Sequence, residues 1–73
     1  MSMNDFTLRV LRDNYKEGTK VRLKQMNDAQ APPVGTIGVV THVDDACQIH
    51  VNWENGSTLA LVPFEDKWEL IND

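Results

Sequence analysis

The sequence predicts an all-β fold preceded by one short helix. Three observations lead to this prediction: short runs of alternating apolar residues recur, Gly and Pro separate these runs, and the first residues have a helical spacing instead. The 73 residues are expected to form one domain, 1–73, with a hydrophobic content of 41 %. Its core should be small, because a chain of this length buries only about 60 % of the surface that it exposes when unfolded.

Residues 3–15 are expected to form the helix, which Gly18 then ends. The side that would face the core consists of Phe6, Val10 and Leu11, with Leu8 and Tyr15 at its margin. Arg9 and Arg12 would lie on the opposite, solvent-exposed side. Alternating apolar residues in the same stretch also fit a strand, and this alternative stays open.

Residues 18–71 are expected to hold five short strands. These are 19–24, 36–43, 48–53, 57–62 and a closing strand that contains Trp68, Leu70 and Ile71. Pro32 and Pro33 stiffen a long loop, 27–35, after the first strand, and residues 64–66 make one helical turn before the last. Five short strands connected in this way are typical of a small SH3-like barrel, whose closure removes exposed sheet edges.

The clearest local signal is Asn55-Gly56. A type I′ turn needs a positive φ at both central residues, which Asn and Gly tolerate best, so a hairpin is expected between strands 48–53 and 57–62. One face of the strand at 36–43 would carry Ile37, Val39, Thr41 and Val43. Gly38, on its other face, suggests a bend or a close approach of another part of the chain.

Three stretches of the chain carry a pattern that resembles a known family: YKEGTKVRL, MNDAQAPPVGTIGVV and VDDACQIHVNWENGSTLALVP. The family is DUF4314, a bacterial domain of unknown function, and the resemblance covers roughly residues 8–71. The matching positions are Tyr15, Gly18, Thr19, Val21, Met26, Asp28, Pro32, Pro33, Gly35, Thr36, Gly38, Val43, Asp44, Asp45, Trp53, Asn55, Gly56 and Ser57. Cys47 stands where the family pattern tends to carry Gly, and Glu54 where it carries Asp.

The resemblance implies a small protein of a phage or conjugative element in Gram-positive bacteria. It implies no activity, so no functional residue is carried over from the family. A looser similarity, in the spacing of Gly18, Val21, Gly35 and Gly38, is to the KOW class of SH3-like barrels in ribosomal and transcription proteins.

The composition argues against several classes of function. No apolar run approaches the roughly 20 residues of a membrane span, and residues 1–10 lack the pattern of a secretory signal. Cys47 is the single cysteine, which cannot form an internal disulfide, so a reduced, cytoplasmic protein is expected. His42 and His50 lack the spacing of zinc ligands, and no nucleophile–base pattern is recognisable. We therefore expect no cofactor, no metal and no catalysis.

The main functional prediction is a non-catalytic module that binds another protein, as a monomer or weak dimer. The candidate residues are Tyr15, Trp53, Trp68, Pro32 and Pro33. Each also has a structural interpretation, because large aromatic side chains stabilise a small core by about 1.5–3 kcal/mol each and prolines stiffen loops. For Trp53, which aligns with Ile49 and Val51, the core interpretation is favoured.

Two alternatives involve nucleic acid. The candidate phosphate-binding residues are Arg9, Arg12, Lys20, Arg22 and Lys24, which belong to a first half, 1–35, of net charge +2. The second half, 36–73, carries −6, so that the whole chain carries −4 and should not attract nucleic acid over long distances. The acidic half could instead imitate nucleic acid and inhibit a basic host protein.

Overall fold

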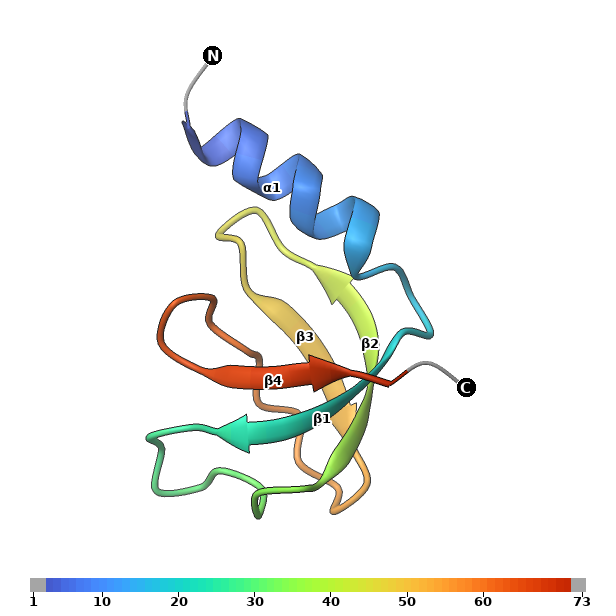
Figure 1. Ribbon diagram of the computed structural model, residues 1–73, viewed down its shortest axis with the longest axis vertical. Helices are drawn as coiled ribbons and strands as arrows, with labels where there is room; N and C mark the ends of the chain where they lie inside the picture. The colour runs from blue at the N-terminus through green and yellow to red at the C-terminus, as the bar shows by residue number, and fades with distance from the viewer. Residues whose placement is uncertain (1–2, 72–73) are drawn as a thin grey trace.

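One helix and four strands make up residues 3–71, the part of the chain that this computed structural model describes. The helix is α1 (Met3–Asn14), and the strands are β1 (Lys20–Gln25), β2 (Ile37–Val43), β3 (Ile49–Trp53) and β4 (Lys67–Leu70). All strand pairs are antiparallel, in the order β3-β2-β1-β4 (Figure 1). The predicted mostly-β fold with an N-terminal helix is confirmed, but the number of strands, five, is wrong.

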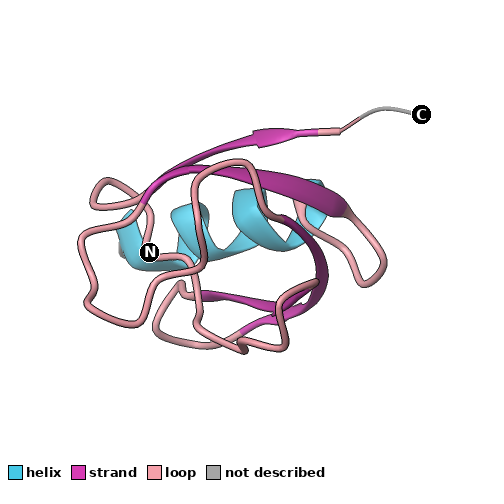
Figure 2. Ribbon diagram, turned by 90° about the horizontal axis from the view of Figure 1, so that it is seen from below, coloured by secondary structure: helices cyan, strands magenta, loops and turns pink. Residues whose placement is uncertain are grey.

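The sheet is open and strongly curled. Figure 2 shows β4 and β1 on one arm of the curl and β3 on the other, with α1 across the far end. Two register shifts, between Leu23 and Gln25 in β1 and between Val40 and His42 in β2, bend the strands at these points. The concave side holds the core, and β3 and β4 form the two edges.

The predicted strand 57–62 is reduced to a single bridge between Leu61 and Ile49. Residues 58–60 form no regular ladder with a neighbouring strand, and Leu59 bonds to side chains instead. The indole of Trp53 donates to the carbonyl of Leu59 at 2.9 Å, and the amide of Leu59 donates to the hydroxyl of Ser57 at 3.3 Å. Because local side-chain bonds compete with the ladder, alternating apolar residues alone did not suffice for a strand.

The turn before this segment also differs from the expectation. The amide of Gly56 donates to the carbonyl of Trp53, and the amide of Trp53 donates to the carbonyl of Ser57, both at 2.9 Å. Gly56 has a φ of 91°, whereas Asn55 lacks the positive φ that a type I′ turn requires. The loop therefore has three residues, with Gly in the left-handed position, which is another common hairpin connection.

The helical interpretation of the N-terminal segment is confirmed, with an end at Asn14 instead of residue 15. Its packed side differs from the prediction: Leu8, Leu11 and Tyr15 contact the core, whereas Phe6 and Val10 are exposed. This side has the spacing i, i+3, i+7 of one helical face. With 12 residues, α1 is too short to cross a membrane, and no helix of the described chain could do so.

The fully or nearly buried core comes from β1, β2, β3 and one connecting residue. It consists of Val21, Leu23, Val40, Val43, Ile49, Val51, Trp53 and Leu61. The prediction that Val39 and Val43 share one face of β2 is wrong. Val39 is 39 % exposed, whereas Val43 is only 6 % exposed. The register shift beside Thr41 reverses the side to which the following residues point.

The expected helical turn at 64–66 is a turn of another kind. The amides of Glu65 and Asp66 both donate to the carbonyl of Val62, while the amide of Val62 donates to the carboxylate of Asp66 at 2.8 Å. Phe64 lies between them with a φ of 74° and is 98 % exposed. A positive φ at a bulky residue is incompatible with a helical turn.

Because Gly38 has no side chain, core side chains occupy the space beside its backbone. A Cβ atom at this position would overlap with the side chains of Val51 and Trp53, both of which belong to the neighbouring strand β3. The close approach expected from the sequence is thus confirmed. It lets two large apolar side chains lie directly over the backbone of β2.

Gly38→Ala should therefore lower the free energy of unfolding by about 1–3 kcal/mol, the usual cost of overpacking a core. Urea unfolding followed by tryptophan fluorescence measures this difference. Val39→Thr, at the neighbouring exposed position of the same strand, is the matched control and should change stability by less than about 0.5 kcal/mol. An unchanged urea midpoint for Gly38→Ala would show that the packing over β2 is loose.

Candidate functional site

Two of the five candidate protein-binding residues are in the interior. Trp53 is only 3 % exposed, and its indole N–H is used by the carbonyl of Leu59. Pro32 is buried too, whereas its neighbour Pro33 is exposed. Trp53 is thus a core residue, as the sequence favoured, and it offers no face to a partner.

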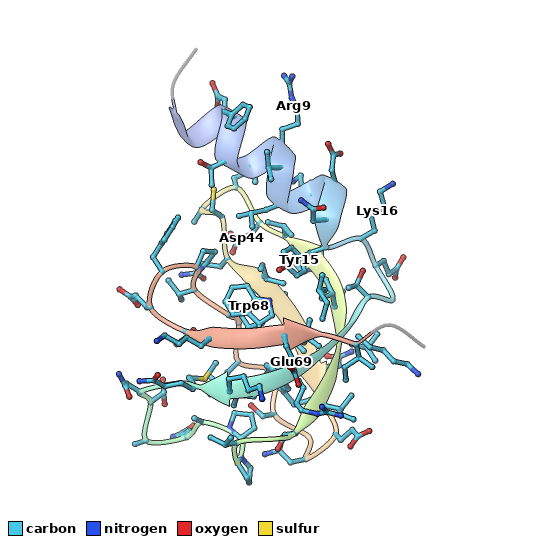
Figure 3. All side chains as sticks on the ribbon, viewed as in Figure 1. Arg9, Tyr15, Lys16, Asp44, Trp68 and Glu69 are labelled. Carbon is cyan, nitrogen blue, oxygen red and sulfur yellow. The ribbon has the colours of Figure 1, made fainter. Side chains whose placement is uncertain are left out.

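Tyr15 and Trp68 come together from opposite ends of the chain. Their ring centroids are 5.9 Å apart in an edge-to-face arrangement, and the Trp68 indole donates to the Tyr15 hydroxyl at 3.1 Å (Figure 3). Trp68 pairs with Leu23 across the sheet, so its side chain points to the concave side. The two half-buried rings close the space between α1 and β4 over the core.

The basic residues of β1 are partly neutralised by an acid of the neighbouring strand. Arg22 lies 2.9 Å and Lys24 lies 3.7 Å from the same carboxylate oxygen of Glu69 in β4. Arg22 and Glu69 are direct cross-strand partners. A phosphate that approached these cations would meet the carboxylate between them.

Arg12 and Arg9 do not extend this group of cations. Arg12 binds the loop after β2: its guanidinium donates to the carbonyl of Val43 at 3.2 and 3.3 Å and to the carboxylate of Asp45 at 2.8 Å. Arg9 projects from α1, well away from Glu69 in the view of Figure 3. The structure therefore divides the five candidate nucleic-acid-binding residues between two parts of the surface.

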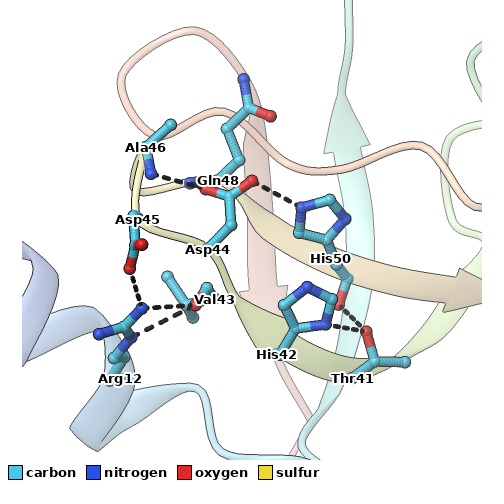
Figure 4. A network of polar contacts seen from close by, with 9 residues as sticks. All are labelled: Arg12, Thr41, His42, Val43, Asp44, Asp45, Ala46, Gln48 and His50. Carbon is cyan, nitrogen blue, oxygen red and sulfur yellow. Dashed lines mark hydrogen bonds and ion pairs between the residues drawn. The ribbon is translucent and has the colours of Figure 1, made fainter.

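Asp44 organises the loop that Arg12 contacts. One carboxylate oxygen accepts the amides of Ala46 and Gln48 at 2.9 and 3.0 Å, and the other lies 2.7 Å from Nε2 of His50 (Figure 4). The hydrogen bond from His50, followed by that from the Gln48 amide, lowers the pKa of Asp44 below its ordinary value of 3.8. These contacts make Asp44 a structural residue of the loop.

His42 and His50 are stacked, an arrangement that was not predicted from the sequence. Their rings are 4.4 Å apart and nearly parallel, and the two residues are cross-strand partners after the register shift of β2. Nδ1 of His42 is 3.1 Å from the hydroxyl of Thr41. Among residues 3–71, no group of three His, Cys, Asp or Glu side chains is suited to hold a metal ion.

A groove lies between the residues that follow β1 and the segment that connects β3 to β4. Its volume is about 410 Å³. The lining is Met26, Asn27, Asp28, Leu59, Ala60, Val62, Glu65 and Asp66. One wall includes the first residues of loop 27–35, the loop of the candidate residues Pro32 and Pro33, although neither proline lines the groove. The opposite wall was not predicted, because 57–62 was expected to form a regular strand.

A model of the family described as "Domain of unknown function (DUF4314)" matches residues 4–71. The chain belongs to the DUF4314 family. The DUF4314 match covers α1 from its second residue onward and all four strands, and thus both walls of the groove. No curated protein and no solved structure matches the chain. Cys47, the position at which the family resemblance led us to expect Gly, has a φ of 63°, a conformation that Gly adopts most readily.

The lowered pKa of Asp44 predicts the pH dependence of an Asp44→Asn variant. A carboxyl with a lowered pKa in the folded state stabilises the protein above its unfolded pKa, and this contribution is lost as the pH falls through the folded value. The wild type should therefore be more stable than Asp44→Asn at about pH 5 to 7. The difference should shrink progressively below pH 3.8.

Urea unfolding midpoints measured across this pH range test the expectation. Glu54→Gln removes an exposed carboxylate from a different loop and serves as the control, with no comparable change in its pH profile. A difference between wild type and Asp44→Asn that is the same at every pH would contradict the assigned hydrogen bonds.

Proposed function

We propose that this DUF4314 domain is a non-catalytic module that binds a protein partner in the groove between residues 26–28 and 59–66. The observation that carries the proposal is the groove itself, in which apolar side chains and carboxylates stand together on two connected walls. Concave surfaces with an apolar lining and a few placed polar groups are the usual form of a binding site.

The chemistry of the walls supports recognition of a short segment. Met26, Leu59 and Val62 supply flexible and branched apolar contact. The carboxylates of Asp28, Glu65 and Asp66 supply polar contacts that could fix the orientation of a partner. Asn27 and Asp28, at the start of loop 27–35, line the groove, whereas the candidate residues named from the sequence lie outside its lining: Tyr15, Trp53, Trp68, Pro32 and Pro33.

We also propose that the domain is an SH3-like barrel, and that the protein belongs to a mobile element and acts in the cytoplasm. The curl of the sheet and the Leu61–Ile49 bridge support an SH3-like barrel, because further pairing along 57–62 would extend the curl towards closure. The family resemblance supports an origin in a phage or conjugative element. The use of a single cysteine supports action in the cytoplasm.

The two nucleic-acid alternatives have weaker support. Binding of phosphate by the β1 cations is opposed by Glu69, which already pairs with Arg22 and Lys24. Imitation of nucleic acid needs a row of available carboxylates, but Asp44 and Asp45 are engaged by His50 and Arg12 within the domain. Protein binding in the groove requires neither set to be released.

Ala60→Trp tests the proposal, because the added indole would fill the groove from one wall. We expect the wild type to enrich specific peptides from a random ten-residue library displayed on phage, and Ala60→Trp to lose these peptides. The measurement is the binding of each selected peptide by fluorescence anisotropy, expected to weaken by about tenfold or more, since truncating or blocking a central contact costs over 1 kcal/mol.

Val39→Trp is the control, since it adds the same indole to an exposed position of β2 outside the groove. Dispersed amide NMR spectra establish that both variants are folded. Enrichment of no peptide by the wild type, or equal peptide affinity for Ala60→Trp and the wild type, would disprove binding in the groove.

A further inference from the structure

We propose that the groove takes an extended peptide segment in which an apolar side chain is flanked by Lys or Arg. The inference rests on the proposed function and names the chemistry of the partner. Charge complementarity carries it. Three carboxylates line the groove, from Asp28 on one wall and from Glu65 and Asp66 on the other, and the lining contains no Lys or Arg.

The arrangement of the carboxylates suits a peptide that lies across the groove. Because acids stand on both walls, a cation on either side of an apolar residue would meet one of them. The apolar part of the lining, chiefly Met26, Leu59 and Val62, would contact the residue between the two cations. We therefore expect the bound peptide to carry an apolar residue with a basic residue on each side of it.

Two of the carboxylates are held in place by their own loops. Asp28 accepts the amide of Gln30 at 2.8 Å, and Asp66 accepts the amide of Val62 at 2.8 Å, each through one oxygen. A carboxylate has two oxygens, so the second one can accept a hydrogen bond from a partner without loss of the first. Such prior ordering lowers the entropic cost of binding.

Glu65 is different, because its carboxylate makes no hydrogen bond or ion pair with the residues that the structure describes. Its side chain is exposed and lines the groove. A change of charge at this position therefore alters the electrostatics of the groove without breaking a contact inside the domain. Substitutions of Glu65 can therefore test the attraction between the groove and a basic peptide without disturbing the folded domain.

The main chain of the groove also favours an extended occupant. The amide and carbonyl of Leu59 are engaged by Ser57 and Trp53, but within residues 3–71 those of Ala60 take part in no hydrogen bond. An extended peptide could pair with these groups, as in the addition of a strand to the edge of a sheet. A helical occupant would have satisfied its own main-chain groups already.

The net negative charge of the domain also favours a basic partner. The second half of the chain carries −6, and the whole chain carries −4. A field of this sign raises the association rate of a basic segment and disfavours an acidic one. The groove lies where the acidic second half meets the residues that follow β1.

The test uses peptides selected by the wild type from the random ten-residue library. We expect them to be enriched in Lys and Arg next to an apolar residue. Glu65→Lys should weaken the binding of a selected peptide about five- to tenfold, and Glu65→Gln should weaken it less, because reversal replaces attraction by repulsion. Higher salt should weaken the binding of the peptide by the wild type and reduce the differences in affinity between the wild type and the two Glu65 variants.

Glu17→Lys is the matched control, with the same change of net charge at an exposed position outside the groove, and should alter the affinity less than about twofold. Selected peptides without an excess of Lys and Arg would overturn the inference but leave binding in the groove intact. Equal losses of peptide affinity in Glu65→Lys and Glu17→Lys would also overturn the inference of a basic peptide and leave binding in the groove intact. If the wild type enriched no peptide, both this inference and the proposed function would fail.

Discussion

The contact between the indole of Trp53 and the carbonyl of Leu59 holds the connecting segment against the sheet. β3 and β4 lie at opposite edges of the sheet, so the chain between them must cross from one edge to the other. Without a regular ladder in residues 57–60, this crossing is fixed by the Trp53 hydrogen bonds and by the bridge from Leu61 to Ile49. Gly38 makes the arrangement possible, because its missing side chain leaves room for the indole.

The groove depends on the same contact. One wall consists of residues in and after the crossing segment, and the other consists of the residues that directly follow β1. Trp53 is buried, yet its indole helps to place Leu59 and Ala60 in the wall of the groove. The hydrogen bond from the indole thus joins a core residue directly to one wall of the groove.

Much of the fold could be predicted from the sequence where the pattern is local. The helix, three strands close to their observed bounds, the burial of Trp53 and the close approach at Gly38 all follow from spacing and residue type. The bulge beside Thr41 could not be predicted, because Thr is compatible with a regular strand and only the pairing with β3 shows the extra residue.

The prediction of the candidate site was less complete for a related reason. The stacking of His42 on His50 depends on that bulge, and the groove depends on residues 57–60 leaving the strand conformation. The departure of residues 57–60 from a strand reflects competition between side-chain hydrogen bonds and the strand ladder, which the alternation of apolar residues does not reveal. The loop 27–35 was recognisable from its prolines, but its partner across the groove was not.

Amide hydrogen exchange of a Trp53→Phe variant tests most directly whether the indole holds the crossing segment, because Phe keeps most of the apolar bulk and removes the indole N–H. The amide of Leu61 donates to the carbonyl of Ile49 at 2.8 Å, and the amide of Val40 in β2 donates to the carbonyl of Thr19, next to β1, at 2.8 Å. We predict that exchange at Leu61 accelerates about five- to tenfold relative to exchange at Val40, the effect of one lost hydrogen bond. Equal changes at the two amides would contradict the claim that Trp53 holds the crossing segment.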